Sequence, residues 1–191
     1  MSCTGFEDKE EAPSDPEIYS IENNSEDRYL GDVVATGPYL DSSAFGGTPI
    51  DQDEWMDMIQ NADKVIAYNW NGNEGNPANT EHYMILNDRI DNSAVSVKEL
   101  NPSEKKQWAA LVTQTENYEE ITPMCFIPHI AFLYYQGDTI VGQSNICFLC
   151  AAIFNQPGRE KCLTTAGTKE VKSFCRSLGL QIYDDHDSVS G

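Results

Sequence analysis

The sequence predicts an α+β fold in which a small antiparallel sheet, built around a hairpin at residues 126–149, packs against two or three helices. The first observation is a pair of segments, Phe126–Tyr135 and Thr139–Leu149, that are rich in Ile, Val, Phe and Tyr. Between them Gln136-Gly137-Asp138 supplies a turn, so the two segments are expected to form one hairpin. The second observation is apolar spacing typical of helices on both sides of the hairpin.

Caps and periodicity place the remaining elements. Thr48-Pro49 is typical of a helix start, and apolar residues follow it at helical spacing: Trp55, Met58, Ile59 and Ala62. Asn101-Pro102 is a second cap and first-turn pair, which predicts a helix over 102–115. The other segments, in chain order, are strands over 64–70 and 81–86, a strand or turn near 94–100, a strand or a continuation of the hairpin over 151–155, and a helix over about 168–178.

Length and charge predict one domain with an acidic tail. The chain has 191 residues and a net charge of −19. Residues 1–32 hold ten Asp and Glu against Lys9 and Arg28, so they are expected to be a disordered tail, before a single α+β domain over 33–183 and a frayed C-terminus over 184–191. The negative charge argues against nucleic-acid binding, which depends on Lys and Arg.

The residues with the most versatile chemistry lie in or beside the hairpin. Three of the six cysteines, Cys125, Cys147 and Cys150, occur there with His129. In a regular hairpin with a two-residue turn, Cys125 lies opposite Cys150. A three-residue turn instead places Cys125 opposite Leu149. Positions 147 and 150 face opposite sides of a regular strand, so the three thiols can meet only if the strand ends near Phe148 and turns.

Four interpretations of these cysteines remain open. They are buried reduced thiols, a Cys125–Cys150 disulfide in an oxidising compartment, a zinc site formed by Cys125, Cys147, Cys150 and His129, or a redox Cys-x-x-Cys at Cys147 and Cys150. The zinc site requires a bend at Pro128, because Cys125 and His129 are about 13 Å apart along a straight strand. The redox site lacks the helix that normally follows such a motif.

Two short motifs in this stretch carry a resemblance. Cys125-Phe126-Ile127-Pro128 and Cys147-Phe148-Leu149-Cys150 resemble a group of small bacterial proteins, many of which carry secretory or lipoprotein leaders. The resemblance runs from about Asp63 to Leu180. The chain departs from the group at His129-Ile130, where the relatives have basic or amide residues, and at Leu149 and Ala151, where they have Glu and Asn. The resemblance implies export or a place in the cell envelope, without a particular activity.

The N-terminus points to the same location. Ser2-Cys3-Thr4-Gly5 resembles the start of a mature bacterial lipoprotein, in which a cysteine is followed by small residues and an acidic tether. Attachment to a membrane is therefore expected only through a lipid at Cys3, because no apolar run approaches the roughly 18 residues that span a bilayer.

These features favour a non-enzymatic protein that is exported or lipid-tethered, with a structural cysteine cluster and no assigned catalytic residue. A thiol-dependent redox protein or enzyme using Cys147 and Cys150 is the second class. An acidic interaction or inhibitor protein, with an unidentified protein partner, is the third. For either of these a cytoplasmic location stays open.

Overall fold

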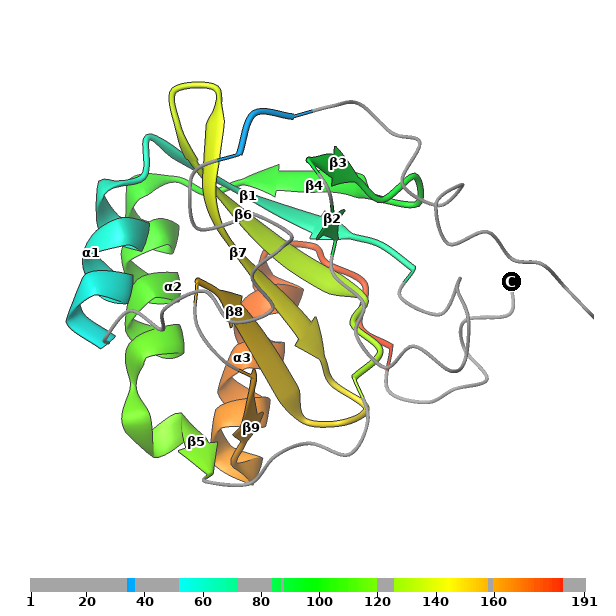
Figure 1. Ribbon diagram of the computed structural model, residues 1–191. Helices are drawn as coiled ribbons and strands as arrows, with labels where there is room; N and C mark the ends of the chain where they lie inside the picture. The colour runs from blue at the N-terminus through cyan, green and yellow to red at the C-terminus, as the bar shows by residue number, and fades with distance from the viewer. Residues whose placement is uncertain are drawn as a thin grey trace, which may run out of the picture.

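The computed structural model describes residues 34–36, 52–71, 84–86, 88–119, 126–157 and 160–183 (Figure 1). Within these residues the helices are α1 (Gln52–Asn61), α2 (Pro102–Thr113) and α3 (Thr165–Ser177), with a 3-10 turn, η3, at Thr115–Asn117. The strands are β1 (Lys64–Asn69), β2 (Ile85–Leu86), β3 (Arg89–Ile90), β4 (Val95–Glu99), β5 (Tyr118–Glu119), β6 (Ile130–Gln136), β7 (Thr139–Cys147), β8 (Ala152–Gln156) and β9 (Glu160–Leu163).

An antiparallel sheet of seven strands, in the order β4-β1-β6-β7-β8-β9-β5, forms the centre of the fold. The predicted hairpin is β6 and β7, and it lies in the interior of the sheet. Both strands are buried along nearly their whole length, because helices cover one face and the segment containing β2 covers the other. The predicted α+β fold is confirmed.

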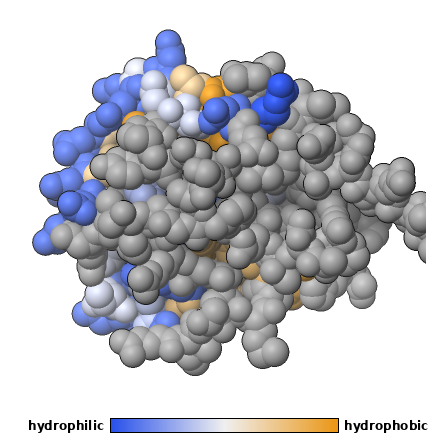
Figure 2. Space-filling model, viewed as in Figure 1, coloured by the Kyte–Doolittle hydropathy of each residue, from blue (hydrophilic) through white to orange (hydrophobic). Residues whose placement is uncertain are grey.

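The three helices pack on one face of the sheet around Trp108 (Figure 1). This α2 side chain is fully buried, and its ring centroid lies 3.9 Å from that of Phe132 in β6 and 5.6 Å from that of Phe174 in α3. Trp55 of α1 meets Tyr134 of β6 edge-on at 5.5 Å. Aromatic side chains bury the largest areas in a core, so this cluster connects each helix to β6. Hydrophilic side chains gather on the outer side of α1 (Figure 2).

A chain of hydrogen bonds crosses the core on this helix-covered face. Trp108 Nε1 donates to Tyr134 Oη at 2.8 Å, Tyr134 Oη lies 2.6 Å from Ser144 Oγ, and Ser144 Oγ donates to Asn155 Oδ1 at 2.6 Å. An indole N–H can only donate, so the Tyr134 hydroxyl accepts from Trp108 and donates to Ser144. Burial raises the pKa of Tyr134 well above its ordinary value, which keeps this hydroxyl protonated.

Two amide side chains of β7 organise the opposite face. Gln143 and Asn145 are fully buried there. Asn145 Oδ1 accepts from the backbone N–H of Met84 at 3.1 Å, and Gln143 Oε1 accepts from that of Ile85 at 3.3 Å. Gln143 also accepts from Asn145 Nδ2 at 3.0 Å and donates to Gln156 Oε1 at 2.6 Å. Because buried backbone donors need partners, the two amides hold the β2 segment against the sheet.

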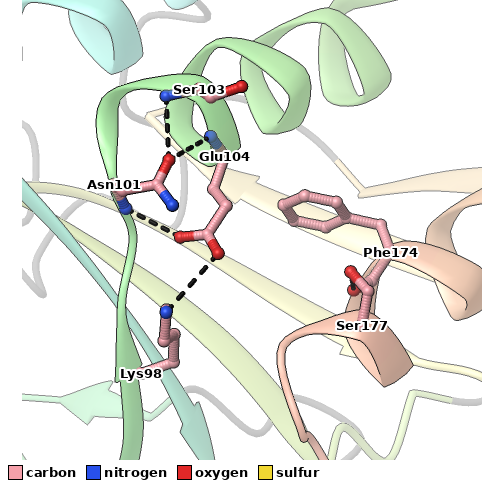
Figure 3. A network of polar contacts seen from close by, with 6 residues as sticks. All are labelled: Lys98, Asn101, Ser103, Glu104, Phe174 and Ser177. Carbon is pink, nitrogen blue, oxygen red and sulfur yellow. Dashed lines mark hydrogen bonds and ion pairs between the residues drawn. The ribbon is translucent and has the colours of Figure 1, made fainter.

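Helix α2 begins at the predicted cap. Asn101 Oδ1 accepts from the backbone N–H groups of Ser103 and Glu104, both at 2.9 Å, and the Glu104 carboxylate accepts from the Asn101 N–H at 2.7 Å (Figure 3). The other carboxylate oxygen lies 3.5 Å from Lys98 Nζ. This reciprocal capping box satisfies N–H groups that the first turn of a helix leaves without partners.

Helix α3 begins at Thr165, earlier than the predicted start at 168. Thr164 is the cap, and its Oγ1 accepts from the Gly167 N–H at 3.0 Å. Gly167 lies directly against η3, where an added Cβ would come within 2.5 Å of the Asn117 carbonyl oxygen. Gly179, with a φ of 83°, follows the helix as the predicted stop.

The hairpin register differs from the regular one. Gln136 pairs with Thr139 across the predicted two-residue turn. The pairing then shifts between Tyr134 and Tyr135, so that Tyr134 pairs with Gly142 and Val141 is the additional residue. Such a bulge displaces by one position every pair farther from the turn.

The ends of the paired strands are also displaced. β6 begins at Ile130, beyond Pro128, which has no N–H to donate to a neighbouring strand. β7 ends at Cys147, so Cys150 lies beyond the pairing. The regular register that places Cys125 opposite Cys150 is therefore wrong.

Several predictions fall on residues outside the described ranges. They concern the tail over 1–32 with Cys3, the helix start at Thr48, the C-terminus over 184–191, and Cys125. Across the described ranges no helix is both long enough and apolar enough to cross a membrane.

Candidate functional site

The Cys147-to-Cys150 motif lies where β7 turns into β8. Cys147 is the last residue of β7 and pairs with Ala152, the first residue of β8. The four residues between them form the turn, and Ala151 adopts the left-handed conformation with a φ of 47°. β7 therefore ends near Phe148 and turns, which is the condition for the three thiols to meet. The motif therefore spans a strand end and a tight turn, and no helix follows it directly.

Cys147 is buried and is not disulfide-bonded. Its Sγ accepts a hydrogen bond from the backbone N–H of Cys150 at 3.2 Å. Around it lie Phe126 and Ala152, with Leu149, Cys150 and Phe154 at the edge of the cluster. The thiol is thus enclosed by apolar side chains, as expected for a cysteine that fills space in a core.

Cys150 is half-buried and disulfide-bonded. Cys147, Cys162 and Cys175 are not disulfide-bonded, so the partner of Cys150 lies outside the described residues, as does the predicted partner, Cys125. A sulfur in a disulfide is not a thiolate, and zinc binds cysteine as a thiolate. In this state Cys150 cannot serve as the predicted metal ligand.

His129 has the environment of a structural residue. The side chain is buried, its ring centroid lies 4.8 Å from that of Tyr183, and Nδ1 lies 3.3 Å from the Trp70 carbonyl oxygen. Its backbone N–H donates to Ile146 and its carbonyl accepts from Trp70. In the described part of the chain no group of three His, Cys, Asp or Glu residues could hold a metal ion, so His129, Cys147 and Cys150 do not form such a group by themselves.

The other two described cysteines are separated from the turn. Cys162 of β9 pairs with Ala152, which in turn pairs with Cys147, so the two thiols are two strands apart on the same face. Adjacent strands are about 4.8 Å apart, which gives a separation of about 10 Å between their backbones. Cys175 lies in the core under the helices, and burial raises the pKa of its thiol above the ordinary value. Neither belongs to the Cys147–Cys150 turn.

A pocket of about 460 Å³ lies beside α3, and no sequence motif predicted it. Ala151 and Leu163 contribute its apolar wall, and the residues with polar side chains are Glu119, Thr165, Thr168, Lys169, Lys172 and Arg176. The available signal was the spacing of the three cations, which places them on one side of α3. Glu119 and Ala151 could not have been added, because they come from distant parts of the sequence.

The chain matches no family model, no curated protein and no solved structure.

Proposed function

We propose that the protein is a non-enzymatic bacterial protein, exported or lipid-tethered, whose fold is stabilised by a disulfide between Cys125 and Cys150. The observation that carries the proposal is the disulfide-bonded Cys150 at the β7–β8 turn. Disulfides persist in secreted and envelope proteins and are rare in the reducing cytoplasm. The resemblance of both cysteine motifs to exported bacterial proteins supports the same location.

The packing of Phe126 supports Cys125 as the partner. Phe126, the next residue, packs against Cys147 and lies beside Cys150 in the same apolar cluster. Its ring centroid is 6.4 Å from that of Phe154 on β8. Cys125 directly precedes Phe126 in the sequence, so the packing of Phe126 supports the proposed pairing. The disulfide would close a loop of about 25 residues, which in the chain-entropy model stabilises the fold by about 3–4 kcal/mol.

Peptide mapping without reduction tests the pairing. Free thiols are alkylated in denaturant, and the chain is then cut before each Asp, which separates Cys3 in fragment 1–7, Cys125 in fragment 91–137 and Cys150 in fragment 138–183. We expect fragments 91–137 and 138–183 to be linked. Zinc at one equivalent per chain, or a link from fragment 1–7 to fragment 138–183, would contradict the proposal.

Two serine substitutions give matched controls. Cys150→Ser should abolish the link and lower the unfolding free energy by about 3 kcal/mol, and reductant should then have no further effect. Cys147→Ser should leave the link intact, because Cys147 is not disulfide-bonded. The location is tested separately by fractionating cells that naturally express the chain. Recovery in the soluble cytoplasmic fraction would contradict export.

The thiol-redox alternative has one specific observation in its favour, because the Cys147 Sγ contacts the backbone of disulfide-bonded Cys150. Exchange requires a thiolate with access to its target, and Cys147 has no exposed surface. We therefore expect Cys147 in the native protein to resist iodoacetamide as fully as Cys175. Rapid alkylation of Cys147 alone would favour the redox function.

A further inference from the structure

The pocket beside α3 has a charge opposite to that of the whole chain. The protein carries a net charge of −19 and only 12 Lys and Arg residues. Three of these cations, Lys169, Lys172 and Arg176, line this pocket together with one carboxylate, Glu119. Among the described lining residues, the formal charges of these side chains sum to +2. A helix face that only contacts solvent does not need a cluster of three cations, because a high net charge already keeps a protein soluble.

The three cations line one wall of a concave site that also contains other polar side chains. Lys172 is half-buried, and its Nζ lies 5.4 Å from the centroid of the Phe148 ring, which favours one position for the ammonium group. Thr168 Oγ1 is a buried atom in the same lining, and no group among the described residues hydrogen-bonds to it. This atom is itself closed to a molecule in the pocket, so the contacts with a ligand come from the three cations.

Size and electrostatics indicate the class of ligand. A volume of about 460 Å³ exceeds what a bare phosphate needs and lies in the usual range for small organic ligands. Arginine and lysine bind carboxylate and phosphate groups through charge-assisted hydrogen bonds. Thr165 is the first residue of α3, where the helix dipole also favours negative charge.

We propose that this pocket binds a small organic dianion, a phosphate monoester or a dicarboxylate, through Lys169, Lys172 and Arg176. Glu119 opposes the binding of an anion, and it limits both the affinity and the charge of the ligand. The proposal is independent of the disulfide, since it uses no cysteine.

Calorimetric titration of the full chain tests the proposal. The probes are phenyl phosphate and succinate, which represent the two sources of the dianion, and NaCl holds the ionic strength constant. A constant ionic strength is essential, because any salt screens the repulsion within so acidic a chain. We expect saturable binding of at least one probe with a stoichiometry of one, and the better probe identifies the group that is recognised.

Four variants distinguish a built site from general charge effects. Lys169→Gln and Lys172→Gln should each weaken binding at least about tenfold, the loss of one charge-assisted hydrogen bond. Lys106→Gln, the same change at an exposed position of α2, should have no effect. Glu119→Gln should strengthen binding, because it removes the negative charge that the described lining residues place in the pocket. The exposed position of Lys169 keeps that variant informative even if the change at Lys172 disturbs the fold.

The proposal is overturned if neither probe binds at millimolar concentration, or if Lys106→Gln weakens binding as much as Lys169→Gln does. It is also overturned if Glu119→Gln weakens binding, since Glu119 would then hold the ligand instead of repelling it.

Discussion

Tyr134 is the residue whose hydroxyl group connects helix α2 to strands β7 and β8 through the core. It accepts from Trp108 and donates to Ser144, which in turn donates to Asn155. All four side chains are buried. A buried donor that loses its acceptor costs more than the hydrogen bond itself contributed, because water cannot replace the partner.

Tyr134→Phe should lower the unfolding free energy by about 1–3 kcal/mol, because it leaves the Trp108 N–H without its acceptor in the core. Urea denaturation measures the change. Tyr135→Phe is the matched control. The Tyr135 hydroxyl lies 3.2 Å from the Tyr68 hydroxyl, in a contact that is only partly buried. An equal loss of unfolding free energy in Tyr135→Phe would contradict a special role for the buried chain of hydrogen bonds.

The cysteines show how far residue-level prediction reaches. The sequence placed Cys147 and Cys150 near the open end of the predicted hairpin, because residue type and spacing give its two strands and the turn between them. Whether the second strand turns near Phe148 or continues past it stayed open. The sequence could not predict the bulge between Tyr134 and Tyr135, which moves the register by one. The bulge brings Gly142 against Met58 of α1, where an added Cβ would lie 2.6 Å from the Met58 Cε, so it depends on packing between distant segments.

At the scale of elements, α2 has the strongest local signal. The cap at Asn101 with Pro102 in the first turn was predicted from the sequence, and in the structure Asn101 and Glu104 form a capping box. We expect Asn101→Ala to lower the unfolding free energy by about 0.5–2 kcal/mol, because two backbone N–H groups of the first turn lose their acceptor. Chemical denaturation measures this loss, and Gln107→Ala, at an exposed position of the same helix, should cause none. Equal effects at both positions would show that the cap does not stabilise the helix.

Elements without local signals were missed. β5 and β9 are short, and they pair with each other through Tyr118 with Leu163 and Glu119 with Cys162. Their formation depends on contacts across more than forty residues of sequence, which no periodicity reveals. The pocket beside α3 was missed for the same reason, since it requires β5, β9 and the β7–β8 turn to meet one helix.

At the scale of the whole molecule, charge is the dominant feature. Residues 1–32 carry ten acidic and two basic side chains, a net of −8, so the remaining chain carries −11 of the total of −19. A high net charge keeps a protein soluble and also destabilises its compact state through repulsion between like charges. The contribution of the tail to this repulsion depends on whether it remains near the folded domain.

The stability of the full chain should therefore rise as NaCl increases from about 10 mM to 150 mM, over which the screening length falls from about 30 Å to about 8 Å. Removal of residues 1–32 should leave the melting temperature at 150 mM NaCl nearly unchanged and should reduce its dependence on salt. Thermal unfolding of both chains at matched salt concentrations measures the two effects. A lower melting temperature of the shortened chain at 150 mM NaCl would show that the tail contacts the domain, and the predicted division of the chain at residue 33 would then be wrong. Equal salt dependence in the two chains would place the repulsion within residues 33–191, which carry the remaining net charge of −11.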